Sequence, residues 1–240
     1  EDNRKAFESY IAYLESGSDF TAVVKSPIII GYDAYLNDEL ADEITLSFDE
    51  IKENVVYSVV YKPKDVTYTV RHFFQNVYDD NYTEDAGLAQ IKTGKVGSYP
   101  ETGEMQLEPD GFSALYLEPE KIAADGSTVF NSCYDRNYYL VDFDLNGGYG
   151  VDPIYARFET PFAVNTPINH GFIFDGWDAD DDGAPDPLPS EIPENDLHFK
   201  ALWRSSGTSY KVVYWLENPD NTTYDYLGGR TVNATSGIRV

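Results

Sequence analysis

Two stretches of the chain decide the fold: residues 66–82 read VTYTVRHFFQNVYDDNY, and residues 208–224 read TSYKVVYWLENPDNTTY. At a constant offset of 142 residues, the matching positions are Tyr68 with Tyr210, Val70 with Val212, Asn76 with Asn218 and Tyr82 with Tyr224. A two-residue slip extends the match to Gly97 and Gly237. An internal repeat of this kind predicts small structural units in series.

A second, weaker match relates residues 26–32 to residues 166–172 at an offset of 140. It continues with Glu53-Asn54 matching Glu194-Asn195, and with Val60-Tyr61 matching Leu202-Trp203. Residues 62–65 and 205–208 have the composition of short linkers. Together the matches predict a first repeat over residues 1–65, a second over 66–137, a third over 138–207, and the truncated start of another over 208–240.

The local patterns indicate β-strands in most of these repeats. Residues 66–73 and 139–145 alternate with the period of a strand, and residues 55–61 and 210–215 are short β-branched and aromatic runs. Asn146-Gly147-Gly148 is a turn signal. Residues 7–17 are ambiguous: Phe7, Tyr10, Ile11 and Leu14 follow helical spacing, but the repeat aligns residues 10–17 with residues 139–147, which favours a strand. We expect a mainly β chain.

The third repeat resembles a known family. The residues on which the resemblance rests are FDLNGG at 143–148, Pro167, Gly171-Phe172, FDGW at 174–177 and ALW at 201–203. These resemble the Listeria–Bacteroides repeat, the B-repeat type of internalin proteins. The second repeat, with YTVRHFFQN at 68–76 and DGSTVF at 125–130, is similar to mucin-binding-protein repeats, and the first repeat ends in a related way at residues 59–63.

The resemblance implies small β-grasp-like domains in an elongated array on a Gram-positive surface protein, α+β by class. It implies an extracellular, cell-wall-attached adhesin segment without enzymatic activity, whose signal peptide and anchor lie outside this sequence. Such a segment acts as a stalk or spacer, or as a module that binds host glycan, mucin or extracellular protein. The alternative is an accessory region of an extracellular carbohydrate-active enzyme or protease. No catalytic residue transfers from these families.

Charge and composition exclude several partners. The chain has 42 acidic against 17 basic residues and a formal net charge of −25, which disfavours nucleic acid and anionic lipid. No apolar run is long enough for a membrane-spanning helix, so we expect no membrane insertion. Nucleophile-elbow, phosphate-loop, dinucleotide-binding and zinc-protease motifs are absent from the sequence. We expect a monomer.

The clearest chemical motif is the run from Asp178 to Asp186, DADDDGAPD. Oxygen atoms at alternate positions can converge on one Ca²⁺, which takes about 6–8 oxygen ligands. The predicted ligands are the carboxylates of Asp178, Asp180, Asp182 and Asp186 and the carbonyl of Ala184, with Gly183 making the turn. The twelfth position holds Pro189 in place of the EF-hand glutamate. Ca²⁺ would have a structural role; the alternative is a solvated acidic loop without a cation.

The remaining candidate residues favour structural roles. Residues 33–43 are interpreted as a solvated acidic face and residues 79–81 as a turn. The sequence predicts that Cys133 is buried and inert, because a single cysteine forms neither an intrachain disulfide nor a cysteine-rich zinc site. Core positions are predicted for the three tryptophans, with exposed sugar-stacking platforms as the alternative, and no shared metal site is predicted for the histidines: Trp177, Trp203, Trp215, His72, His170 and His198.

Overall fold

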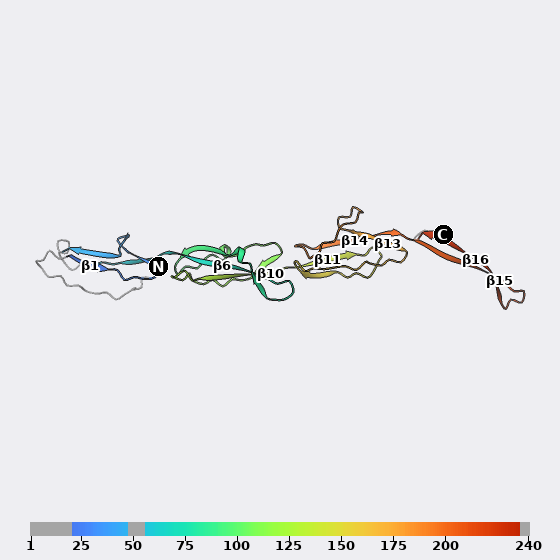
Figure 1. Cartoon of the computed structure of the whole chain (residues 1–240), viewed down its shortest axis with the longest axis horizontal. Coiled ribbons are helices and arrows are strands. Elements are labelled where there is room, and N and C mark those ends of the chain that lie inside the picture. Colours follow the sequence, from blue (N-terminus) through green and yellow to red (C-terminus); the bar gives the residue numbers. More distant parts are fainter. Residues whose placement is uncertain (1–20, 48–55, 236–240) are drawn as a thin grey trace. The chain divides into compact units, whose positions relative to one another are not determined.

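The computed structural model describes residues 21–47 and 56–235. It is mainly β (Figure 1), with 51% strand and 3% helix, which confirms the predicted class. Within the described ranges, no helix is long and apolar enough to cross a membrane.

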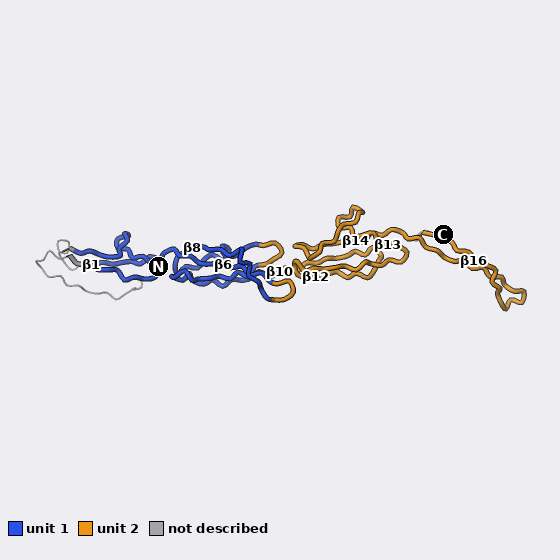
Figure 2. The backbone as a smooth tube through the Cα atoms, viewed as in Figure 1, with its two compact units in different colours: residues 1–75, 81–108, 114–135 blue, residues 76–80, 109–113, 136–240 orange. Residues whose placement is uncertain are grey.

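The chain divides into two compact units (Figure 2). Unit 1 comprises residues 1–75, 81–108 and 114–135, and unit 2 comprises residues 76–80, 109–113 and 136–240. Two loops from the second repeat therefore belong to unit 2. The four-part division at residues 65, 137 and 207 stays a prediction.

Unit 1 begins with two small sheets. Strands β1 (Thr21–Lys25) and β4 (Glu43–Ser47) pair antiparallel. In the other sheet β2 (Tyr32–Leu36) lies between β3 (Glu39–Leu40) and β5 (Val60–Pro63). The turn from β2 to β3 consists of Asn37 and Asp38, both with positive φ, as a tight two-residue hairpin requires.

The main sheet of unit 1, here called the β6 sheet, has the order β7-β6-β10-β9, with β8 also paired to β6. Its strands are β6 (Asp65–Gln75), β7 (Tyr82–Glu84), β8 (Gln90–Lys95), β9 (Phe112–Ala114) and β10 (Val129–Arg136). Strand β6 runs antiparallel to β8 and parallel to β10. The connections contain a 3-10 turn, η1 (Ala86–Leu88), and a four-residue helix, α1 (Thr102–Met105).

Alternate residues of β6 form the core of unit 1. Tyr68, Val70 and His72 point to the same side and are buried, as the strand period predicts. Three residues that follow in the chain cover them: Met105, Ile122 and Phe130. Residues from the second repeat therefore suffice to close this core.

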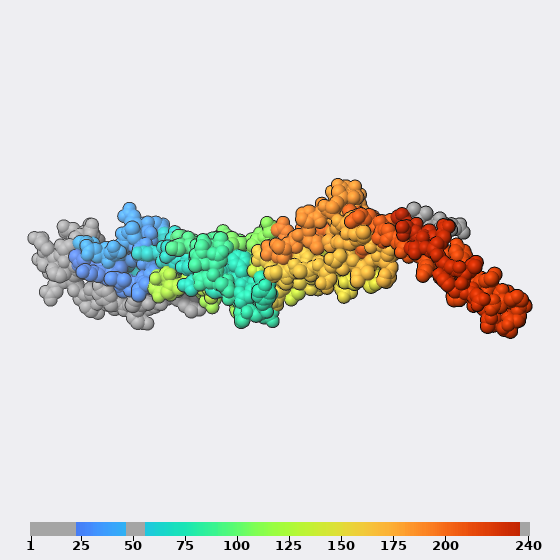
Figure 3. Space-filling model, turned by 45° about the vertical axis from the view of Figure 1, so that its right-hand side comes forward, coloured from blue at the N-terminus to red at the C-terminus, as the bar shows by residue number. Residues whose placement is uncertain are grey.

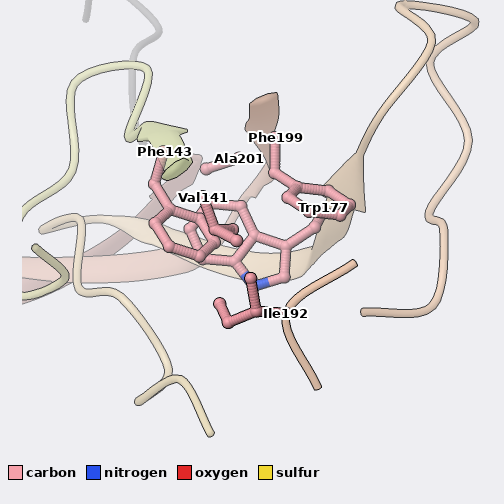
Figure 4. Packing of buried hydrophobic residues seen from close by; sticks show 6 residues of the cluster. All are labelled: Val141, Phe143, Trp177, Ile192, Phe199 and Ala201. Atoms are coloured by element: carbon pink, nitrogen blue, oxygen red, sulfur yellow. The ribbon is translucent and has the colours of Figure 1, made fainter. Parts of the chain in front are cut away.

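The main sheet of unit 2, here called the β11 sheet, has the order β12-β11-β14-β13. Its strands are β11 (Tyr138–Asp144), β12 (Ile154–Arg157), β13 (Phe172–Asp178) and β14 (Leu197–Ser205). Figure 4 shows its buried cluster, in which Phe143 stacks on Phe199 and is tilted against Trp177: Val141, Phe143, Trp177, Ile192, Phe199 and Ala201. Strand β11, the first of this sheet in the sequence, pairs in parallel with β14, the last, just as β6 pairs in parallel with β10.

Unit 2 ends in a hairpin of β15 (Gly207–Glu217) and β16 (Tyr224–Thr235). This sheet has two strands in the described chain, so one layer leaves both of its faces uncovered. Trp215 is accordingly 59% exposed, and its predicted core position is wrong. Trp177 is 5% exposed and Trp203 packs against the same cluster, so both of these lie in the core as predicted.

The strand registers follow the sequence repeats. In β2 and β5, Ala34 lies opposite Tyr61; in β13 and β14, Phe174 lies opposite Trp203. The offsets of 140 and 142 residues relate these two pairs. The two halves of the weaker match therefore belong to equivalent antiparallel pairs.

The other strands predicted from the sequence have different outcomes in different parts of the chain. The strands expected at 66–73 and 139–145 correspond to β6 and β11. Of the run 55–61, residues 56–59 are not in a strand and β5 begins at Val60, while residue 55 lies outside the described residues. Residues 7–17 also lie outside them. The likeness to β-grasp domains stays a prediction.

Candidate metal centre

The acidic motif lies in the connection between β13 and β14, drawn light orange in Figure 3, where it stands out from the surface of unit 2. Asp178 is the last residue of β13 and pairs with Lys200 of β14. The register of β13 shifts between Phe174 and Gly176, which turns Trp177 towards the core. The next residue, Asp178, should then face solvent, yet it is only 4% exposed because the connection folds back over it.

Backbone hydrogen bonds close the connection on itself. Asp186 forms a bridge to Trp177, and its N–H donates to the Trp177 carbonyl at 2.6 Å. The N–H of Ala179 donates to Asp186 Oδ2 at 2.8 Å, and the N–H of Gly183 donates to Asp178 Oδ2 at 3.0 Å. Gly183 adopts φ +84°, as its predicted turn role requires. The loop thus holds its two terminal carboxylates in fixed positions.

Three of the five predicted ligands come together. Asp178, Asp180 and Asp186 each place a carboxylate oxygen within 4.8 Å of the other two. Ca²⁺ binds oxygen at about 2.3–2.6 Å, so ligands on opposite sides of one ion are about 5 Å apart. The spacing therefore suits a single cation with all three carboxylates in contact with it.

Asp178 supplies an independent reason to expect a cation. Its Oδ1 is buried and has no hydrogen-bond partner within the described part of the chain. Burying a charged oxygen without a partner costs several kcal/mol, and nature pairs such charges or coordinates them to metals. A cation bound between Asp178, Asp180 and Asp186 would satisfy this atom.

The other two predicted ligands are engaged differently. Asp182 Oδ1 accepts from the N–H of Ala184 at 2.7 Å, and Asp180 Oδ1 accepts from the N–H of Asp182 at 3.2 Å. Neither Asp182 nor Ala184 belongs to the gathered set, and their roles as ligands stay predictions. Such short side-chain-to-backbone bonds also stabilise an acidic loop that has no metal.

The sequence analysis did not predict that the protein places a lysine side chain beside this loop. Lys200 Nζ lies 3.0 Å from Asp181 Oδ1. The hydrogen bond and charge of Asp181 raise the pKa of Lys200, and the charges of Asp144 and Asp178 act in the same direction. The pairing is across strands and has no local sequence signal, since it depends on the register that places Lys200 opposite Asp178.

The histidines and the cysteine form no common site. His72 contacts Tyr134, His170 contacts Tyr149 and His198 contacts Asp142. Cys133 is half-buried, not fully buried as predicted, because it lies in β10 on the face opposite to the core. Burial and the charge of Asp135 raise the pKa of its thiol, which favours the unreactive protonated form.

No protein-family model matches the chain, and no curated protein matches it. The chemistry of the loop therefore rests on its own atoms. An all-oxygen, carboxylate-rich set in a turn of several residues is suited to a hard divalent cation.

Proposed function

We propose that this chain is a non-enzymatic segment of a bacterial cell-surface adhesin, in which small β-domains in series act as a spacer or as a binding module. The observation that carries the proposal is that each main sheet closes its own hydrophobic core. The β6 sheet uses residues 66–130 and the β11 sheet uses residues 139–203. In chains built in this way, partners bind to the outer surface of the domains and not in a shared cavity.

Calcium is the cation proposed for the loop between β13 and β14. The loop supplies carboxylate oxygens on a flexible turn, whereas Mg²⁺ demands near-ideal octahedral geometry and zinc sites favour nitrogen and sulfur. Extracellular calcium modules bind with dissociation constants of about 10⁻⁴–10⁻³ M. An affinity in that range fits the proposed location on the cell surface, attached to the wall.

A binding role has a candidate surface on the outer side of the β11 sheet. The exposed rings of Tyr138 and Tyr155 lie 5.4 Å apart, centre to centre, with their planes tilted by 31°. The Arg157 guanidinium lies 5.8 Å from the Tyr138 ring and is held by Asp80. Adjacent exposed aromatic faces beside charged hydrogen-bonding groups offer stacking and polar contacts to a host glycan.

A glycan array and a mucin pull-down test the choice between binder and spacer. We expect binding that Tyr155→Ala reduces at least about tenfold, corresponding to about 1.4 kcal/mol. The matched control is Tyr116→Ala, which removes another exposed tyrosine from unit 1. Silence of the unmodified chain in both assays would leave the spacer role, and equal loss in both variants would contradict the assigned surface.

A further inference from the structure

The residue pairing in the terminal hairpin of β15 and β16 matches the pairing of β6 with β8. In β6 and β8, Tyr68 lies opposite Lys92; in β15 and β16, Tyr210 lies opposite Val232. The offset of 142 residues relates the first partners, and the two-residue slip to 140 relates the second. Strand β15 is therefore the equivalent of β6, and β16 is the equivalent of β8.

The two strands differ in what lies on their second edge. Strand β6 pairs there with β10 in parallel, with Val70 opposite Phe130 and His72 opposite Ser132. Within residues 21–47 and 56–235, β15 pairs with β16 alone. Figure 1 shows the hairpin as two strands without a third beside them.

One face of β15 is apolar and uncovered in the described chain. Tyr68 and Val70 are buried, whereas their equivalents Tyr210 and Val212 are exposed and half-buried. Further along the same face, Tyr214 and Leu216 are also exposed. A strand of 11 residues without proline, with one edge unpaired in the described chain, is a template for another strand.

We propose that the free edge of β15 accepts a parallel strand with the pattern of β10. The occupant is an extended segment of a further copy of this repeat, with an aromatic residue opposite Val212 and a small polar residue opposite Tyr214. This is the pattern with which Phe130 and Ser132 meet Val70 and His72. Main-chain hydrogen bonds supply the affinity of such strand addition, and alternate side chains supply its specificity.

The β6 sheet also indicates which amides of β15 take part. The N–H of Thr69 donates to the Thr128 carbonyl at 3.0 Å, next to the parallel ladder with β10. The equivalent of Thr69 is Lys211, and strand alternation adds Ser209 and Val213 to the same edge. These three N–H groups are the expected donors to the added strand.

The test extends the full chain after Val240 with a copy of residues 98–136, the stretch that follows β8 and ends with β10. Amide exchange of residues 207–217 is measured with and without the extension. We expect exchange at Ser209, Lys211 and Val213 to slow at least about tenfold, since paired edges resist local opening.

Two variants of the extended chain control for non-specific association. Lys211→Pro removes one outward-facing N–H and blocks the edge while leaving the side that pairs with β16 intact. Phe130→Asp, made only in the appended copy, removes the aromatic contact. Both should restore fast exchange, and equal protection in all extended chains would overturn the proposal. Protection that rises with concentration in the unextended chain, with dimers in sedimentation, would overturn it in favour of a second copy as the occupant.

Discussion

The β6 sheet, with five strands, and the β11 sheet, with four, both pair their first strand in the sequence parallel to their last, but they bury different polar groups. In the β6 sheet one buried group is His72, whose Nδ1 lies 2.8 Å from the hydroxyl of Tyr134 and whose Nε2 has no partner in the described chain. In the β11 sheet it is Asp178, whose Oδ2 accepts from Gly183 and whose Oδ1 has no partner in the described chain. The buried histidine of the β6 sheet therefore pairs with a hydroxyl, whereas the buried carboxyl of the β11 sheet lies outside the hydrophobic cluster, under the connection between β13 and β14.

The difference shows that strand order does not dictate how a buried polar group is satisfied. The Tyr134 hydroxyl accepts from the N–H of Leu107 at 2.8 Å and can donate its own proton to His72 Nδ1. Burial lowers the pKa of His72, so the imidazole stays neutral. Asp178 Oδ1 is a buried oxygen without a partner in the described chain, and the β11 sheet is consequently the one for which a cation is proposed.

The largest expected effect on stability distinguishes a tryptophan in the core of the β11 sheet from one in the terminal hairpin. Trp177→Ala removes a side chain that packs on Phe143, Phe174 and the rest of the buried cluster, and we expect a loss of about 3–5 kcal/mol of unfolding free energy for the β11 sheet. Trp215→Ala should change it by less than about 0.5 kcal/mol, because that ring is exposed. Chemical denaturation of the two variants measures both values.

The same experiment tests whether the β6 sheet and the β11 sheet unfold independently. If the cores are independent, the transition of the β6 sheet keeps its midpoint in Trp177→Ala. Simultaneous loss of both transitions would contradict separate cores.

Calcium should act on the β11 sheet alone, with the second largest effect. At a concentration one hundred times its dissociation constant, a ligand that binds only the folded state adds about 2.7 kcal/mol. We expect calcium to raise the melting temperature of the β11 sheet and a chelator to reverse the rise. Titration calorimetry should report one site, and the β6 sheet should melt unchanged.

Two variants test the ligand set. Asp178→Asn removes the central carboxylate and should abolish the calcium effect; in chelator it should be at least as stable as the unmodified chain, because the uncompensated buried charge is gone. Asp182→Asn should retain most of the calcium effect, because Asp182 lies outside the gathered carboxylates. An equal loss in Asp182→Asn would extend the set towards the five predicted ligands. Unchanged melting and no heat of binding in the unmodified chain would remove the site.

The contrast also shows what could be predicted from the sequence. Strands β6 and β11 were predictable because alternation of apolar residues is a local signal that their buried cores preserve. Repetition predicted equivalent pairs such as Ala34–Tyr61 and Phe174–Trp203. The position of Trp215 was not predictable in the same way, because burial of a strand residue depends on a neighbouring layer that the local pattern does not specify.

The loop between β13 and β14 shows the same limit. Alternating aspartates identified the motif, and three of them gather. The burial of Asp178 depends on a register shift at Gly176 and on the return of the chain at Asp186, and neither has a signal in the spacing of the acids. Pairing of Lys200 with Asp181 is likewise a consequence of register.

The smallest expected effect is a pH dependence of the stability of the β6 sheet. Because burial lowers the pKa of His72, with Lys92 acting in the same direction and Asp85 opposing it, the unfolded chain binds the proton more tightly. The stabilisation is complete above the unfolded pKa of about 6.5 and decreases as the pH falls below it, by up to about 1.4 kcal/mol per pH unit. Denaturation of the β6 sheet between pH 7.5 and 5 measures this slope, in a range where ordinary carboxylates stay charged.

Substitution identifies the responsible group. His72→Leu should remove the slope, even though it also removes the partner of Tyr134 and lowers stability at every pH. His198→Gln is the matched control, since that histidine is exposed beside Asp142 in the β11 sheet and should leave the slope of the β6 sheet intact. A slope that survives in His72→Leu would place the titrating group elsewhere in the chain.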